Sequence, residues 1–353
     1  MQIKLQPRNT PSKFWQILSP IIALLATIIC GIALFSLNGQ PPFLALQTLF
    51  ISPLTNLYGL TEIAVKAAPI LLIAIGLAIC FQGKIWNIGA EGQLTVGAIF
   101  GSAIAIFFPN INNYSLLLIC LIAGILGGAI WGSISALLKV RFNANEILTS
   151  LMLNYIAISL LNYLVRGPLK DPEGFNFPES VIFSQFATLP SLITGTRLHL
   201  GVIFALLTAI IAWVIMWRSH FGFSVRVIGS SEQAAAYAGI NNKRIIWLTL
   251  LLSGSLAGLA GVCEVTGPIG QLRTTISPGY GYTAIIAAFI GRLNPLLIIL
   301  SSLLLAELYV GSELLQIKLG FPIALAMVFQ GILLFFLLAT DLLIYNRILI
   351  NNR

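Results

Sequence analysis

Charged residues are scarce in this chain of 353 residues, because only 8% are Asp, Glu, Lys or Arg while 58% are hydrophobic. This composition excludes an ordinary soluble globular domain and is typical of a polytopic membrane protein. Acidic residues are rarer than basic ones, with 11 against 19, and the net charge is +8. No separate soluble domain is expected, and residues 1–353 are predicted to form a single transmembrane domain.

Cysteine and histidine are also rare. The four cysteines lie within or at the edge of apolar segments and show no CxxC spacing: Cys30, Cys80, Cys120 and Cys263. They are expected to be small packing residues rather than disulfides or metal ligands. The two histidines, His199 and His220, lie near opposite ends of one apolar segment. A histidine metal site is therefore not expected.

Enzyme motifs are missing from the chain. The sequence contains no HExxH, no GxSxG and no GxxxxGK[ST] phosphate loop, so no catalytic residue and no cofactor are expected on this polypeptide. A transporter without a phosphate loop uses either an ion gradient or an ATPase on another chain. Ion-driven carriers commonly place acidic relays within their spans, and the scattered acidic residues here favour the separate ATPase.

Long apolar segments are what the chain has in abundance. Segments of about 20 apolar residues span a bilayer, and about ten candidates follow one another, the eighth being short: residues 14–35, 60–81, 92–108, 114–138, 147–165, 200–217, 245–265, 279–291, 295–310 and 321–340. The predicted fold is an all-α helical membrane bundle. Residues 14–35 are predicted to be peripheral, with residues 60–165 and 245–340 as two four-helix halves.

The distribution of Lys and Arg predicts the orientation. Most of them fall in loops that a cytoplasmic N-terminus places inside, as the positive-inside rule requires. Both termini and the loop of residues 218–244 are then cytoplasmic. The positive charge is expected to attract membrane lipids and not nucleic acid. The external loop of residues 166–198 is either a docking surface for an external partner or a solvated connector.

Two Gly-rich segments, residues 86–93 and 277–282, interrupt the apolar pattern at corresponding places in the two halves. Irregular backbone at membrane depth is tolerated only against protein or a water-filled cavity, and paired breaks often mark a transporter's central site. The alternative is two ordinary interfacial turns. The predicted solute pathway contains Trp86, Asn87, Gly89, Glu91, Gln93, Asn154, Tyr280 and Tyr282. For Glu91 a structural role, bonding free backbone amides, is favoured over contact with the solute.

Other polar residues within the spans have structural explanations. Glu62 and Lys66 stand four residues apart in the order that favours an intrahelical ion pair. Asn154 and Tyr155 could bond a hydroxylated ligand or join helices. Close helix packing is predicted by GxxxG steps: Gly97 with Gly101, Gly124 with Gly128 and Gly132, and Gly254 with Gly258.

An ordered set of motifs resembles the permease subunits of bacterial ABC importers for nucleosides and simple sugars, which are related to branched-chain amino acid and ribose permeases. The motifs are residues 83–93, Asn145-Glu146 leading into 151–155, 226–229, 237–240, 252–261, 277–282 and 291–295. The resemblance covers most of the chain from the second apolar segment onward. It implies a subunit of the bacterial plasma membrane that translocates a nucleoside or simple sugar.

The resemblance also implies partners. Residues 233–239 would form a short helix that docks in a groove of a cytoplasmic ATPase, which would hold ATP and Mg. The expected coupling residues are Glu232, Gln233, Ala234, Ala235, Tyr237 and Gly239. Such importers usually have Glu where this chain has Gln233, so the polar contact with the ATPase is the uncertain part.

A second permease chain, identical or different, and an extracytoplasmic solute-binding protein would complete the assembly. The remaining alternatives are an ion-gradient-driven carrier, a permease for branched-chain amino acids and a scaffolding membrane subunit.

Overall fold

The computed structural model describes residues 2–8, 12–37, 41–322 and 324–351. The chain ends, on which the predicted cytoplasmic termini depend, lie outside these residues. Contacts divide the chain into two compact units, which are described separately. The smaller unit is Met1–Leu60 with Glu307–Arg353, and the larger unit is Thr61–Ala306. Whether residues 1–353 act as one domain stays a prediction.

In the smaller unit, helix α1 (Lys13–Leu37) packs against helix α13 (Ala324–Tyr345). The Phe35 ring stacks on Phe329 with ring centroids 5.7 Å apart. A short helical segment that the sequence did not predict follows α1: α2 (Pro42–Leu46), η1 (Gln47–Ile51) and η2 (Ser52–Leu54). This segment packs against the second part of α12 (Pro295–Leu319). The contact is close at Gly311, where the Leu49 carbonyl group lies against the glycine.

A pair of strands is the exception to the all-α prediction. Strand β1 (Gln2–Pro7) pairs antiparallel with β2 (Asn346–Asn351), with Gln2 opposite Asn351. Strand β1 alternates polar and apolar residues, as in Ile3 and Leu5, and this two-residue period favours a strand over a helix. Strand β2 shows no such period, because Ile348, Leu349 and Ile350 follow one another.

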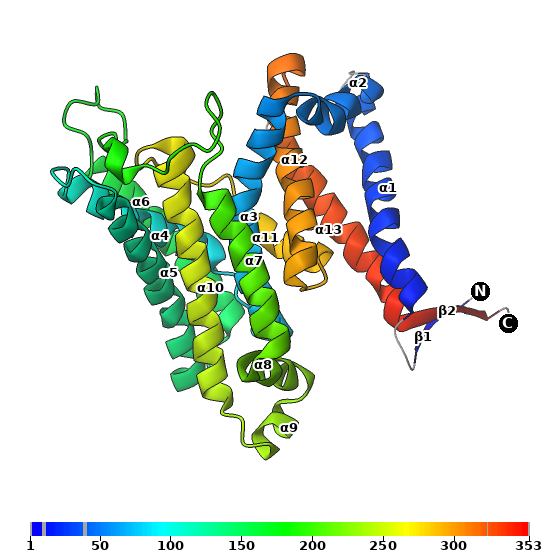
Figure 1. Cartoon of the computed structure of the whole chain (residues 1–353). Helices are drawn as coiled ribbons and strands as arrows, with labels where there is room; N and C mark the ends of the chain where they lie inside the picture. The colour runs from blue at the N-terminus through cyan, green and yellow to red at the C-terminus, as the bar shows by residue number, and fades with distance from the viewer. Residues whose placement is uncertain (1, 9–11, 38–40, 323, 352–353) are drawn as a thin grey trace. The chain divides into compact units, whose positions relative to one another are not determined.

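All ten predicted apolar segments are helical in the described structure (Figure 1). Eight helices of the described residues are long and apolar enough to cross a membrane, whereas α11 and the apolar part of α13 are shorter. The polytopic helical bundle is thereby confirmed. The remaining main helices, with α3 and α12 shared between the units, are α3 (Leu57–Gln82), α4 (Ala90–Phe107), α5 (Ser115–Phe142), α6 (Glu146–Arg166), α7 (Gly201–Arg218), α10 (Asn242–Glu264) and α11 (Tyr280–Ile290).

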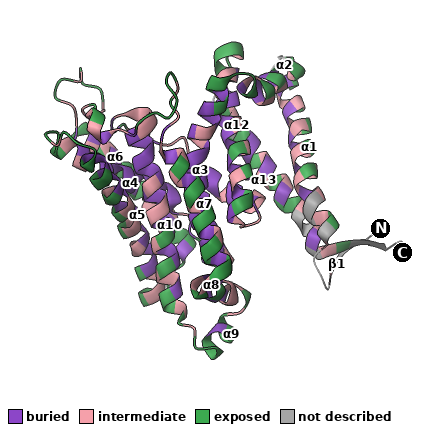
Figure 2. Ribbon diagram, viewed as in Figure 1, coloured by how far each residue is buried: buried purple, intermediate pink, exposed green. Residues whose placement is uncertain are grey.

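The core of the larger unit is a close contact of α4, α5 and α10, so helices of the two predicted halves interleave. Glycines make this contact possible, as predicted. A Cβ atom on Gly128 would lie 2.2 Å from the Gly254 carbonyl oxygen, and one on Gly97 would lie 2.3 Å from the Gly258 Cα. The helix backbones therefore touch, which only glycine permits. Figure 2 shows buried residues along α3 and α4, while α6 and α7 are largely exposed.

The long loop of residues 166–198, with its short helix η3 (Gln185–Ala187), covers the upper end of the larger unit in Figure 1. It runs beside the segment after α10, which begins as η4 (Val265–Ile269). The amide of Ser180 donates to the Leu272 carbonyl oxygen at 2.9 Å, and the amide of Leu189 donates to that of Thr266 at 2.7 Å. The loop is therefore part of the folded structure and not a free connector.

Arg197, at the end of this loop, fixes it to α3. Its guanidinium donates two hydrogen bonds to the Glu62 carboxylate, from Nε at 2.9 Å and from a terminal nitrogen. The sequence predicts Lys66 as the partner of Glu62, whereas the ion pair that the structure gives Glu62 is with Arg197, from a distant part of the sequence. Lys66 and Arg197 also act electrostatically on Glu264, a buried carboxylate that the sequence did not single out. The result is a mixed-charge cluster with two residues of each sign.

His199 follows Arg197 and is 3% exposed. Its Nδ1 accepts a hydrogen bond from the Gly201 amide at 3.1 Å, whereas its Nε2 is buried without a hydrogen-bond partner among the described residues. Burial lowers the pKa of His199 from the ordinary 6.5 to about 4 because a charged imidazole loses its hydration.

Gly128→Ala should destabilise the protein, because the added methyl group must separate α5 from α10. Overpacking of this kind costs about 1–3 kcal/mol, which a lower thermal unfolding midpoint in detergent would report. Gly331→Ala on α13 is the matched control, because a Cβ atom added there would have no other atom within 4 Å. An equal effect of both substitutions would contradict the close-contact explanation.

The free energy of unfolding should decrease as the pH is lowered, because His199 becomes protonated in the unfolded chain but not in the folded one. A folded-state pKa below the unfolded value makes the loss begin near the unfolded pKa and grow until the folded pKa is reached. The expected loss is about 2 kcal/mol at about pH 5. Thermal unfolding across this range should depend less on pH in His199→Asn than in the wild type. His220→Asn, at an exposed position two residues beyond the other end of α7, should keep the wild-type dependence.

Candidate functional site

The first Gly-rich segment is a break between α3 and α4. Its backbone is irregular from residue 85 to residue 89, and side chains from α6 satisfy its polar groups. The amide of Ile88 donates to Ser150 Oγ at 3.1 Å, and the Ile88 carbonyl oxygen accepts from Asn154 Nδ2 at 2.9 Å. Asn154 Oδ1 also accepts from the Gly92 amide at 2.8 Å. Asn154 therefore substitutes for the missing helical hydrogen bonds.

Asn87 organises the same break from its other side. Its Nδ2 donates to Gln93 Oε1 at 3.1 Å and to Ser253 Oγ on α10 at 3.0 Å. Its Oδ1 accepts from the Gly89 amide at 2.9 Å. Asn87 is 0% and Gln93 1% exposed, so the structure places these two predicted pathway residues inside a closed hydrogen-bond network. Gly89 is buried beside Ser150 in the same network.

The second Gly-rich segment lies directly against the first. Glu91 Oε2 accepts a hydrogen bond from the Gly281 amide at 2.6 Å, and a Cβ on Gly281 would lie 2.5 Å from the Glu91 nitrogen. Ser277 Oγ accepts from the amides of Gly279 and Tyr280 at 3.0 and 2.8 Å, which caps the start of α11. Glu91 thus bonds a backbone amide, as the structural prediction requires, but the amide belongs to the distant segment.

Three aromatic side chains of this region are exposed: Trp86 at 38%, Tyr155 at 59% and Tyr282 at 40%. We call them the aromatic face. Asn154 Nδ2 donates to the Tyr282 hydroxyl at 3.2 Å, and Tyr155 follows Asn154 on α6.

Stacking on Phe289, with ring centroids 6.4 Å apart, orients Trp86. Tyr280, by contrast, is 2% exposed. The structure therefore divides the predicted pathway residues into a buried inner network and the exposed aromatic face. Tyr155 belongs to the aromatic face but was not among the predicted pathway residues.

The loop of residues 218–244 contains two helices, α8 (His220–Ser230) and α9 (Glu232–Tyr237). The sequence did not predict α8. The resemblance implied a helix at residues 233–239, and α9 begins one residue earlier and ends two residues earlier than that. Ser231 Oγ accepts from the Ala234 amide at 3.2 Å and caps the start of α9.

Gly239, at a φ of +75°, ends α9, because its left-handed backbone lets the amides of Gly239 and Ile240 bond the carbonyl groups of Ala236 and Ala235 at 3.0 Å. Glycine adopts this conformation without a steric cost, and the paired bonds are those of a Schellman motif. Gly239, one of the predicted coupling residues, is thus the residue that stops α9.

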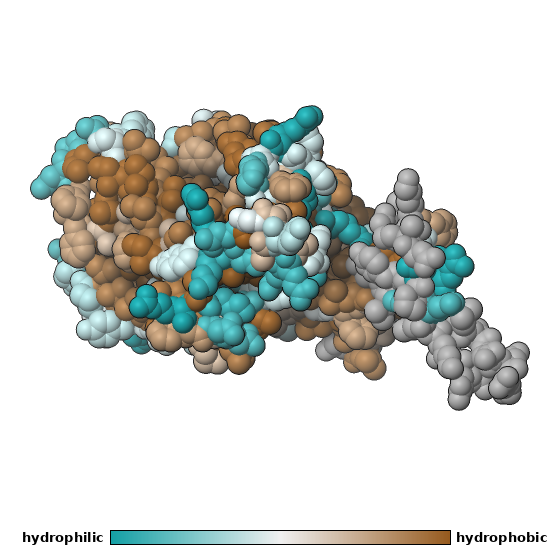
Figure 3. Space-filling view, turned by 90° about the horizontal axis from the view of Figure 1, so that it is seen from below, coloured by the Kyte–Doolittle hydropathy of each residue, from teal (hydrophilic) through white to brown (hydrophobic). Residues whose placement is uncertain are grey.

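Nearly all of α9 faces away from the protein. Ala235 is buried at 0%, whereas Tyr237 is 97% exposed and Glu232, Gln233 and Ala234 are exposed too. The helix lies at the lower end of the larger unit in Figure 1, opposite the loop of residues 166–198. Seen from this end, hydrophilic side chains gather in the middle with hydrophobic ones around them (Figure 3). Such a helix is available for contact with another molecule.

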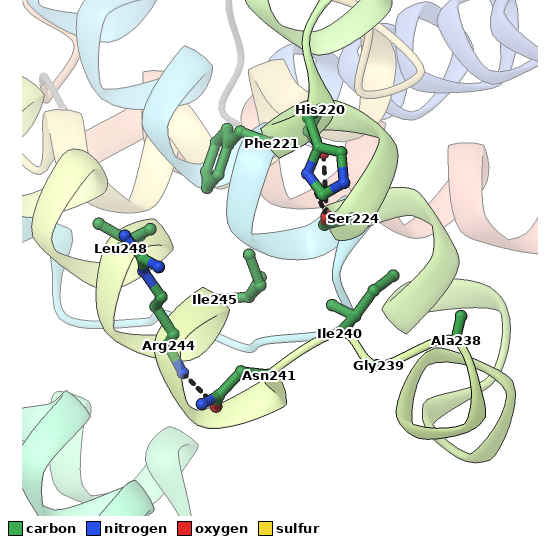
Figure 4. A pocket seen from close by; sticks show the side chains of 10 residues that line it. All are labelled: His220, Phe221, Ser224, Ala238, Gly239, Ile240, Asn241, Arg244, Ile245 and Leu248. Carbon is green, nitrogen blue, oxygen red and sulfur yellow. Dashed lines mark hydrogen bonds between the residues drawn. The ribbon is translucent and has the colours of Figure 1, made fainter.

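A cavity of about 440 Å³ lies between α8 and the link from α9 to α10 (Figure 4). His220, Ser224 and Arg244 are among its lining residues. Ser224 Oγ donates to the His220 carbonyl oxygen at 2.9 Å, and the Arg244 amide donates to Asn241 Oδ1 at 3.1 Å. Both bonds stay within one helix or its cap and do not cross the cavity.

Comparison with known proteins identifies relatives along most of the chain. A glucose ABC transporter permease protein of Haloferax volcanii is 34% identical over 352 residues, which cover 97% of this chain and 92% of the relative. A guanosine ABC transporter permease protein of Bacillus subtilis is 31% identical, covering 87% and 88%. A nucleoside ABC transporter permease protein of Lactococcus lactis is 27% identical, covering 85% of each chain. No solved structure matches the chain.

The family described as the permease component of branched-chain amino acid transport systems matches residues 59–338. The matched range begins at α3 and includes both Gly-rich segments, the aromatic face and α9. The chain is thus a multi-pass membrane protein that belongs to this family of transport permeases.

Proposed function

We propose that this permease carries a nucleoside or a simple sugar into the cell as part of an ATP-binding cassette importer. The observation that carries the proposal is the similarity, over most of the chain, to permeases named for glucose, guanosine and nucleosides. The family description, which names branched-chain amino acids, keeps those solutes as the second candidate. ATP and Mg would bind to the partner ATPase and not to this chain.

The ATPase partner is proposed to bind α9. A docking helix must expose its surface, and α9 keeps only Ala235 for its own fold. Small side chains at Ala234 and Ala236 would allow close seating in a groove. The cavity beside the α9–α10 link would let the helix move with the ATPase. Glu232 and Gln233 are both exposed, so either can supply the polar contact.

The external solute-binding protein is proposed to dock on the loop of residues 166–198. This loop lies at the end of the larger unit opposite α9 (Figure 1), and its hydrogen bonds to the segment after α10 make it a defined surface. The orientation that follows from the basic residues places this end outside and α9 in the cytoplasm. Both termini are proposed to be cytoplasmic, in the plasma membrane of a bacterium.

The solute is proposed to pass along the aromatic face, which a second permease chain, identical or different, would enclose. Aromatic rings stack on nucleobases and on the apolar faces of sugars. The inner network of Asn87, Glu91 and Gln93 is too buried to reach a solute in this conformation. Its proposed role is to hold Trp86 and Tyr282 in position.

Purification of the complex from its native membrane, followed by reconstitution in vesicles, tests the function. Recovery of an ATPase and a binding protein, with ATP-dependent uptake of labelled guanosine or glucose, would support the proposal. Uptake of labelled leucine alone would favour the second candidate. Uptake that depends on a proton or sodium gradient and not on ATP would favour an ion-driven carrier. Stable partners without flux would indicate a scaffolding subunit.

Changing Ala235 to Trp and Gly239 to Val together should uncouple transport from ATP hydrolysis. The first substitution displaces the buried side of α9, and the second strains its left-handed stop. Uptake should fall by about tenfold or more while the protein still inserts. The matched control is Gly320→Val after the end of α12, at a φ of +70° with open space around it. Unchanged uptake in the double variant would refute the coupling assignment.

Removing the rings of the aromatic face should weaken solute handling. Tyr282→Leu and Tyr155→Leu are each expected to raise the KM for uptake by about tenfold, since a stacking contact contributes about 1–3 kcal/mol. Tyr282→Phe keeps the ring and should stay near the wild type. Tyr114→Leu, an exposed tyrosine at the start of α5, is the control. If its KM rises as much as that of Tyr282→Leu, the face has no specific role.

A further inference from the structure

A second cavity, of about 350 Å³, lies where the ends of several helices meet. It is lined by the turn after α3, the end of α5, the start of α6 and parts of α8, α9 and α10. None of its residues belongs to the aromatic face, and only Glu232 is shared with the predicted coupling residues. We call it the lysine cavity, after Lys84, Lys139 and Lys243 in its wall.

The charges of the lysine cavity leave one positive charge in excess. Glu146 and Glu232 also line it, and the Glu146 carboxylate pairs with Lys139 at 2.8 Å. Lys84 and Lys243 are exposed at its edge. Lys243 also stands in the first turn of α10, whose N-terminal amides favour an anion. The lining therefore matches a singly charged anion.

Lys84 occupies a backbone position that favours glycine. Its φ is +54°, and the amides of Lys84 and Ile85 bond the carbonyl groups of Phe81 and Cys80 at 3.0 Å, so Lys84 is the left-handed residue that ends α3. A side chain in this conformation is sterically disfavoured. Residues held in such conformations cluster at functional sites. The unfavourable conformation therefore indicates a role for the Lys84 side chain.

The wall also holds an unsatisfied acceptor. The side-chain oxygen of Asn242 is buried and has no hydrogen-bond partner among the described residues, although Asn242 lines the cavity. A buried acceptor of this kind is costly unless a donor reaches it. The ligand that fits is thus an anion that also carries a hydroxyl group.

We propose that the lysine cavity binds a singly charged phosphodiester that bears hydroxyl groups, of the kind found in the headgroup of phosphatidylglycerol. The phosphate would lie between Lys84 and Lys243, and the buried Asn242 side chain would turn into the cavity to accept a hydrogen bond from a hydroxyl. Because the cavity joins the start of α9 to the ends of α3 and α5, its occupant stabilises the position of α9. The same chemistry occurs in a membrane lipid and in a soluble phosphodiester, and the experiment separates these sources.

The test measures the thermal unfolding midpoint of the full chain in nanodiscs of phosphatidylcholine with increasing fractions of phosphatidylglycerol. The wild type should gain a few degrees at saturation. Lys84→Gly should unfold at a higher temperature than the wild type in phosphatidylcholine alone, since it removes the backbone strain, and should lose most of the gain from phosphatidylglycerol. Lys243→Gln should lose part of that gain.

Arg292→Gly is the matched control, because Arg292 is also a left-handed cation that ends a helix, at a φ of +53°, and does not line the cavity. It should keep the full gain from phosphatidylglycerol. Loss of the gain in Arg292→Gly as well, or its persistence in Lys84→Gly, would show a general surface effect and overturn the site.

Two further ligands complete the design. If the ligand is soluble, glycerophosphoglycerol added to phosphatidylcholine nanodiscs should stabilise the wild type but not Lys84→Gly. If only the lipid binds, glycerophosphoglycerol should stabilise neither protein. Phosphatidylmethanol, an anionic phosphodiester without hydroxyl groups, should give a smaller gain than phosphatidylglycerol. An equal gain would overturn the role of Asn242, and no gain with any phosphodiester would overturn the proposal.

Discussion

The arrangement of the larger unit depends on how the polar backbone groups between α3 and α4 are satisfied. A membrane interior offers no water to unpaired amides and carbonyls, yet residues 85–89 are not helical. Ser150 and Asn154 on α6 and Asn87 in the break itself supply the missing partners. With these bonds in place, α4 can start at Ala90 and Trp86 can stand exposed beside it. The position of α6 is set by the same bonds.

Close glycine contacts are the second requirement, because side-chain hydrogen bonds act only over short distances. Gly97 and Gly128 bring α4 and α5 onto α10, and this approach puts Ser253 within reach of Asn87. Gly281 has the same effect at the start of α11, where its bare backbone lies against Glu91. Packing and polar satisfaction are therefore parts of one arrangement. A larger side chain at any of these glycines would lengthen a hydrogen bond as well as open a gap.

Much of this fold could be predicted from the sequence. Hydropathy located all ten main helices because their length and composition are local properties. The pairing of Glu62 with Arg197 could not be predicted, since the residues are far apart in sequence and only the folded loop brings them together.

The division of the predicted pathway residues into buried and exposed also depends on tertiary contacts. Asn87 and Trp86 are neighbours in sequence, yet one is enclosed by α10 and the other is open. Strands β1 and β2 could not be predicted, because their pairing joins residues from the two ends of the chain. The short helix α8 mixes polar and apolar residues, so it is not an apolar span.

The link between Asn87 and Ser253 has a consequence for biosynthesis. Ribosomes deliver the chain from its N-terminus, and N-terminal parts generally fold first. Helices α4 and α5 are therefore in the membrane before α10 and α11 have been made. During that interval Asn87 and Glu91 lack their partners on the later helices, and the glycine surfaces of α4 and α5 have no α10 to cover them. The nascent permease must remain in a half-assembled state until residue 281 has been inserted, and that state is the one in which a membrane chaperone or protease would recognise it.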